Sequence, residues 1–92
     1  MDFMKKLVRD KIPELFKCKF YIADEEEYWQ RLKDKLQEEV LEFLNDSNGE
    51  ELADILEVVY AIRDFKGIDL ELIRDKKSKE KGAFKKRVIY ET

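Results

Sequence analysis

Two consecutive helical patterns, separated by a short turn, constrain this chain more than any other feature of its sequence. Apolar residues recur every three or four positions from Glu25 to about Asn45, which predicts an amphipathic helix. Residues 50–66 carry a second helical pattern, and the Asp46-Ser47-Asn48-Gly49 segment between the two is typical of a tight turn. The sequence therefore predicts a helical hairpin.

Capping residues mark the ends of these helices. Asp24, with Glu27 three residues later, has the spacing of a capping box and predicts the start of the first long helix. Gly67 stands where the second long helix should end, because glycine adopts a left-handed backbone without strain. Asp69 then predicts the start of a third helix over residues 70–81.

The remaining segments predict smaller elements around the hairpin. Pro13 indicates a short helix that begins or breaks near it, and residues 18–22 and 84–90 are β-prone, so we expect them to form a minor β element. A chain of 92 residues makes one domain, residues 1–92, with a thin core. Because two long helices do not bury their apolar faces alone, we expect an all-α fold with a four-helix-bundle-type core completed by dimerisation.

Composition narrows the possible functions. Charged residues make up 45% of the chain, but the net charge is only −3. This balance argues against a general nucleic-acid or membrane binder, because such proteins carry a large excess of basic residues. No apolar run approaches the roughly 18 residues that span a bilayer. The absence of histidine excludes an imidazole base and the common zinc sites. Cys18 has no second cysteine to pair with, and we expect a cytoplasmic location.

The second long helix carries carboxylates where apolar residues are expected. Residues 52–62 are apolar nearly all round, which predicts a central, buried helix, yet Asp54 and Glu57 interrupt them. At helical spacing Glu51 shares a face with Asp54 and with Val58. A buried carboxylate without a partner is costly, so these residues point to a bound cation.

The first long helix repeats the arrangement. Glu39 lies on the apolar face of that helix, and Glu42 follows one turn later. In a hairpin, the two pairs of carboxylates would face each other, and oxygen ligands of this kind select Mg²⁺ or Mn²⁺. The alternative is a solvated helix with ordinary ion pairs, such as Lys35 with Glu39. The sequence leaves both open.

The acidic pattern resembles that of a known family. Glu38-Glu39-x-x-Glu42 followed by Glu51-x-x-Asp54 is similar to the EExxE…ExxD signature of the MazG-like all-α nucleoside triphosphate pyrophosphatase superfamily. The flanking segments KLVRDKIP at residues 6–13 and GAFKKR at residues 82–87 resemble its phosphoribosyl-ATP pyrophosphohydrolase-like branch. The resemblance covers nearly the whole chain.

The resemblance implies a Mg²⁺-dependent enzyme that cleaves a nucleoside triphosphate between its α- and β-phosphates, releasing a nucleoside monophosphate and pyrophosphate. The substrate would be a housecleaning target or a phosphoribosyl-ATP-like nucleotide, and the protein would be a homodimer or a dimer of dimers. The metal ligands it implies are Glu39, Glu42, Glu51 and Asp54. Lys77 matches a phosphate-binding lysine of the superfamily, and Lys81 stands where the branch has arginine.

Further candidates complete the predicted site. Glu38 is the candidate catalytic residue that orients water, and Glu57 is a candidate support for the metal ligands. The candidate substrate-binding cations, besides the two lysines of the third helix, are Lys6, Arg9, Lys11 and Lys35. The alternative function is a non-enzymatic RNA- or protein-binding dimeric module that retains the fold, because residues 74–87 carry eight basic side chains and two acidic ones.

Overall fold

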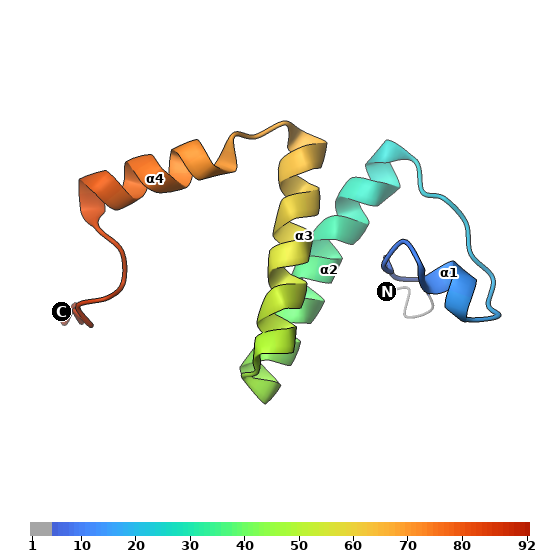
Figure 1. Cartoon of the computed structure of the whole chain (residues 1–92), viewed down its shortest axis with the longest axis horizontal. Coiled ribbons are helices and arrows are strands. Elements are labelled where there is room, and N and C mark those ends of the chain that lie inside the picture. Colours follow the sequence, from blue (N-terminus) through green and yellow to red (C-terminus); the bar gives the residue numbers. More distant parts are fainter. Residues whose placement is uncertain (1–4) are drawn as a thin grey trace.

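The protein is all-helical over residues 5–92, the part that the computed structural model describes. The helices of this described part are α1 (Ile12–Leu15), α2 (Glu25–Asp46), α3 (Gly49–Lys66) and α4 (Leu70–Lys81). Figure 1 shows α2 and α3 as an antiparallel hairpin, with α1 and its flanking segment on one side and α4 extending away on the other. The predicted all-α fold and the helical hairpin are confirmed.

Side-chain caps fix the hairpin. The Asp24 carboxylate accepts a hydrogen bond from the backbone N–H of Glu27 at 2.8 Å, which starts α2 as predicted. Ser47 ends α2 in the left-handed region at φ 53°. The Asn48 side chain then accepts from the backbone N–H of Glu51 at 2.9 Å and starts α3. Two residues therefore suffice to reverse the chain.

The end of α3 and the start of α4 are also set locally. Gly67 adopts φ 65°, and the backbone N–H of Ile68 donates to the carbonyl of Arg63 at 3.1 Å, which closes α3. Asp69 accepts from the backbone N–H of Leu72 at 3.2 Å and caps α4. Within the described part of the chain, α2 and α3 form the only extensive helix–helix packing, so α4 packs extensively on no other helix.

A thin core holds α2 against α3. Leu32 is completely buried and Val58 is 8% exposed. Beyond them, the Phe65 ring of α3 lies edge-on to Tyr28 at 5.2 Å between centroids and stacks on Trp29 at 5.8 Å. No helix among residues 5–92 is both long enough and apolar enough to cross a membrane.

The prediction that α3 is a central, buried helix holds on one face only. Leu52 and Leu56 are 53% and 48% exposed, because α2 covers a single side of α3 within one chain. Leu41 and Leu44 of α2 are exposed to a similar degree. The apolar surface that the sequence assigns to a core thus lies open in the single chain.

The expected minor β element is wrong for this chain. Residues 18–22 and 84–90 are not strands, and no strand occurs within the described range. A strand needs a second strand to satisfy its backbone N–H and C=O groups. These two segments lie at opposite ends of a molecule about 49 Å long, as Figure 1 shows, so neither can pair with the other. Their backbones remain open to water.

Truncation of Leu32, the central core residue, should strongly destabilise the fold. Leu32→Ala should lower the free energy of unfolding by roughly 2–5 kcal/mol, because it removes the one large side chain that is fully buried among residues 5–92 and leaves a cavity. Leu15→Ala is the matched control, since Leu15 is 70% exposed on α1. Urea unfolding followed by circular dichroism compares the two. Equal losses would contradict the core described above.

Candidate metal centre

The hairpin brings three predicted metal ligands together. One carboxylate oxygen from each of Glu39, Glu51 and Asp54 lies within 4.8 Å of the others. Glu39 comes from α2, and the other two lie one turn apart on α3. The short turn and the antiparallel direction of the helices therefore produce the cluster, as the i,i+3 spacing predicts.

The fourth predicted ligand lies beside this group. Glu42 is exposed at the edge of the cluster and faces Glu51. Desolvation, followed by a hydrogen bond with Glu42, raises the pKa of Glu51 to about 6. Two carboxyl groups this close repel each other unless a proton or a cation lies between them.

Two oxygen atoms of the cluster have no partner. Glu39 is 6% exposed, and its Oε2 atom is buried without a hydrogen bond. The Oε2 atom of Glu51 is in the same condition. Burial raises the pKa of Glu39, whereas its ion pair with Lys35 at 3.2 Å opposes that rise. Unpaired, buried carboxylate oxygens with no nitrogen or sulfur ligand among them fit a hard divalent cation such as Mg²⁺.

Positive side chains surround the carboxylates. Lys35 bridges Glu38 and Glu39, with its Nζ atom 3.2 Å from an oxygen of each. Lys6 reaches Glu38 from the N-terminal segment at 3.4 Å. The predicted catalytic Glu38 is thus held by two lysines and lies outside the three-carboxylate group. Its position is set by these ion pairs.

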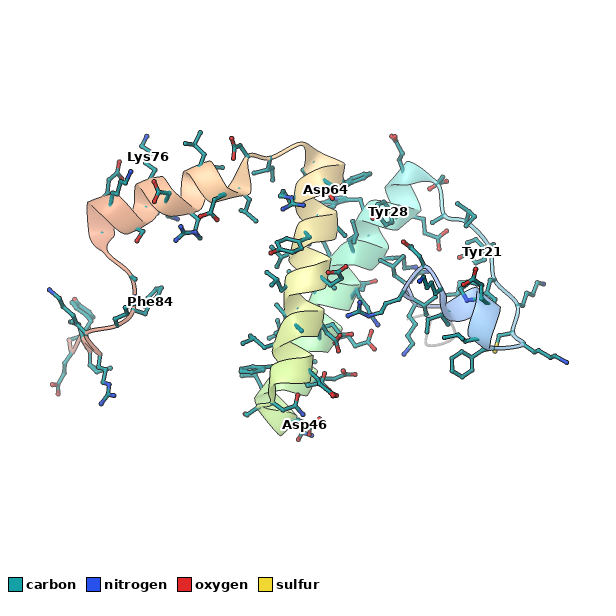
Figure 2. The ribbon with its side chains drawn as sticks, viewed as in Figure 1. Tyr21, Tyr28, Asp46, Asp64, Lys76 and Phe84 are labelled. Atoms are coloured by element: carbon teal, nitrogen blue, oxygen red, sulfur yellow. The ribbon has the colours of Figure 1, made fainter. Side chains whose placement is uncertain are left out.

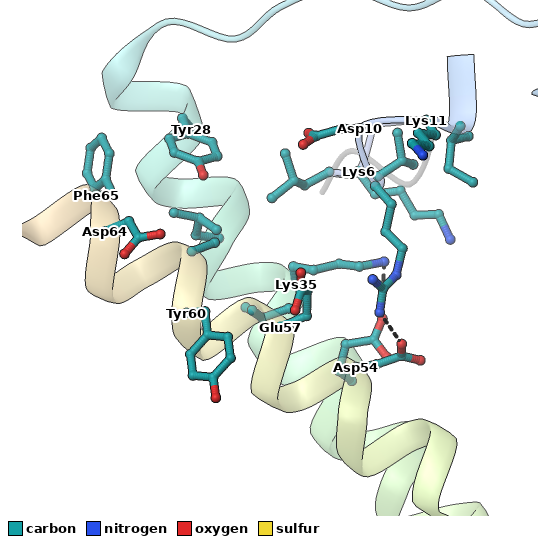
Figure 3. A pocket seen from close by; sticks show the side chains of 18 of the residues that line it. Lys6, Asp10, Lys11, Tyr28, Lys35, Asp54, Glu57, Tyr60, Asp64 and Phe65 are labelled. Carbon is teal, nitrogen blue, oxygen red and sulfur yellow. Dashed lines mark hydrogen bonds and ion pairs between the residues drawn. The ribbon is translucent and has the colours of Figure 1, made fainter. Parts of the chain in front are cut away.

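A cavity of about 1020 Å³ opens between the N-terminal segment and the hairpin. Figure 3 shows its lining, with Lys35, Asp54 and Glu57 on the hairpin and Lys6 and Lys11 on the facing segment. The cavity is lined by all four of the predicted cations outside α4, which are Lys6, Arg9, Lys11 and Lys35. Glu57 lines it as well. The carboxylate cluster therefore meets the cavity at Glu39 and Asp54.

Aromatic and acidic residues that no sequence pattern marked as part of the site also line the cavity. Tyr28 and Phe65 form one wall, and Tyr60 and Asp64 extend it along α3 (Figure 3). Tyr60 and Asp64 follow Glu57 by three and seven positions, the spacing of one helix face. That spacing is the signal that could have found these two.

The predicted phosphate-binding lysines of α4 are not brought to the cluster. Lys77 and Lys81 are exposed and do not line the cavity. Figure 2 shows the helix that carries them, marked by Lys76, on the far side of α3 from the N-terminal segment. Within one chain, these lysines are separate from the site.

Comparisons with protein-family models, with curated proteins and with solved structures find no match to this chain. The family resemblance therefore stays a prediction. The features of the chain that bear on function are the carboxylate cluster, the cations around it and the cavity.

Replacement of Glu51 should change how stability depends on pH. Its pKa is raised on folding, so its contribution to stability is present when it is protonated and is lost as the pH rises through about 6. In metal-free buffer, Glu51→Gln should therefore have the higher melting temperature at about pH 7.5 and little advantage at about pH 4.5.

Thermal unfolding in the presence of a chelator measures this difference. Glu50→Gln is the matched control, because Glu50 is the exposed neighbour on the same helical turn. If the melting temperature depends on pH in the same way in wild type and Glu51→Gln, the pKa of Glu51 is not raised by its surroundings.

Proposed function

We propose that this protein is a Mg²⁺-dependent nucleotide pyrophosphohydrolase, which hydrolyses the α–β phosphate bond of a nucleoside triphosphate. The observation that carries the proposal is the pair of buried, unpartnered carboxylate oxygens, on Glu39 and Glu51, beside a cavity lined by cations. The EExxE…ExxD resemblance supports the same function. The products would be a nucleoside monophosphate and pyrophosphate.

The metal would be held by Glu39, Glu51 and Asp54, with Glu42 beside them. When bound, Mg²⁺ would neutralise phosphate charge and orient a water molecule toward phosphorus. An all-carboxylate cluster supplies the negative charge and the oxygen ligands that such an ion needs. Mn²⁺ would fit the same ligands.

The cations around the cavity would hold the polyphosphate. Lys6 and Lys35 lie next to the cluster, and Lys11 lines the cavity farther along the same segment. Their charges oppose the negative charge that develops on the departing pyrophosphate. The cavity has the size of a typical small-molecule site, and its aromatic wall of Tyr28 and Phe65 suits a nucleotide base.

Glu38 is the candidate proton acceptor. Water attacks phosphorus, the bond to the bridging oxygen breaks, and the proton lost from water passes to a carboxylate. Glu38 lies beside the cluster but is not one of its three members, and its two oxygens pair with Lys6 and Lys35. The two lysines fix the orientation of Glu38 beside the cluster.

Product analysis tests the reaction. With Mg²⁺ and a panel of nucleotides that includes dUTP and phosphoribosyl-ATP, we expect pyrophosphate and a monophosphate, and no orthophosphate. Asp54→Asn should lower turnover by at least about 100-fold, the scale for loss of a group that stabilises developing charge. Asp64→Asn is the matched control, because Asp64 lines the same cavity outside the cluster. Absence of pyrophosphate from every nucleotide would leave the alternative, an interaction module.

A second copy of the chain would complete the core. The open apolar face of α3 includes Leu52 and Leu56, and a shallow groove beside them is lined by Ala53, Ile55 and Val59. Two hairpins packed through such faces make a four-helix bundle. We propose this homodimer, or a dimer of dimers, as the active form.

Sedimentation tests the assembly. Wild-type protein at micromolar concentration should sediment as a dimer or larger. Leu56→Glu should shift it toward the monomer, because it places a charge in the centre of the apolar face. Leu15→Glu, on the exposed surface of α1, should leave the assembly unchanged. A wild-type monomer would contradict the proposal.

A further inference from the structure

The N-terminal segment places a guanidinium on one of the metal ligands. The Nη2 atom of Arg9 donates to Oδ1 of Asp54 at 2.5 Å, across 45 positions of sequence. Asp54 belongs to the three-carboxylate group, and Figure 3 shows the contact as a dashed line reaching Asp54 from the facing segment. The cluster is therefore partly neutralised from outside the hairpin.

Lys35, the other cation on the cluster, is held more firmly in place than Arg9. Lys35 lies one turn before Glu39 on the same helix and is only 16% exposed, so it is a fixed part of α2. The Arg9 side chain is 57% exposed and comes from a separate segment. Arg9 can leave Asp54 without any change in the hairpin, whereas Lys35 cannot leave Glu39 so simply.

The backbone around Arg9 is held by contacts of another kind. Leu7, Val8 and Ile12 are half-buried against the cavity, and Lys6 pairs with Glu38. These contacts keep the guanidinium close to Asp54, at a high effective concentration. They would also keep it beside the cavity after the ion pair with Asp54 is broken.

We propose that Arg9 competes with the divalent cation for Asp54: it occupies this carboxylate when no metal is bound, and metal binding displaces it into the cavity. The proposal rests on the metal site proposed above. The single negative charge of one carboxylate cannot offset both a guanidinium and a divalent cation, and the two positive charges repel each other. The displaced guanidinium remains at the cavity, where a phosphate is its natural partner.

This competition links metal and substrate. The metal site would be masked until a divalent cation releases Arg9, and the released Arg9 would then add a two-pronged donor for the polyphosphate. An anion that binds Arg9 would in turn favour metal binding, because coupling between two ligands is reciprocal. Arg9 thus neutralises Asp54 in the metal-free protein and binds the substrate in the metal-bound protein.

Calorimetry with Mn²⁺ alone, without nucleotide, tests the competition. Arg9→Gln should bind Mn²⁺ more tightly than wild type, by a factor in the usual coupling range of about 5 to 150. Lys11→Gln is the matched control, because it removes the same charge from the same segment and has no ion pair with the cluster. It should change the affinity by less than about twofold, the size of a screened, longer-range effect.

A second measurement uses the wild-type protein and does not depend on the folding of a variant. In ¹⁵N NMR of the arginine side chains, the Arg9 signal should move on addition of Mg²⁺ toward that of a solvated guanidinium. The Arg74 signal is the internal control, since Arg74 pairs with Glu71 on α4, away from the cluster.

The outcomes separate this inference from the proposed function. If wild type binds Mn²⁺ but Arg9→Gln binds no more tightly than Lys11→Gln, or the Arg9 signal does not move, the competition is overturned and the metal site stands. If wild type binds no Mn²⁺, both are overturned.

Discussion

Repulsion between carboxylates across the α2–α3 hairpin is the constraint on which the rest of this structure depends. Glu39 is nearly sealed from water and faces two carboxylates of α3, with one of its oxygens unpartnered. Such an arrangement is unfavourable without positive charge. Lys35 supplies part of that charge from within α2, and Arg9 supplies part from the N-terminal segment. The position of that segment over the hairpin therefore follows from the charge of the cluster as well as from its apolar contacts.

The cluster occupies space that a larger core would otherwise fill. Leu32 and Val58 are the only buried apolar residues of the described chain, and Glu39 is buried close to them on the same interface. A protein this small has little stability to lose. A cation that binds the folded cluster and not the unfolded chain would raise the stability by mass action. Metal binding and folding would then be coupled, which gives a physical reason to place the cluster between the two long helices.

The long helices and the carboxylate cluster were predictable because they depend on residues that are close together in the sequence. Asp24, Asp69 and Gly67 act within one helical turn, so the bounds of the long helices can be read from the sequence to within about a residue or two. The carboxylate cluster follows from i,i+3 spacing and a short turn. The contact between Arg9 and Asp54 joins residues 45 positions apart, and no local pattern encodes it. The β prediction failed for the same reason, since propensity says nothing about whether a partner strand is near.

The direction of α4 determines where its lysines lie relative to the cavity. This direction is set by the Gly67 backbone and the Asp69 cap, because α4 packs extensively on no other helix of the described chain. Leu72 and Ile73 are 64% and 49% exposed, so α4 presents apolar as well as basic surface. In this arrangement Lys77 does not line the cavity of its own chain. If Lys77 binds phosphate, as the family resemblance implies, a second copy must present it. The same dimer would then both cover the apolar face of α3 and bring Lys77 to the phosphate site.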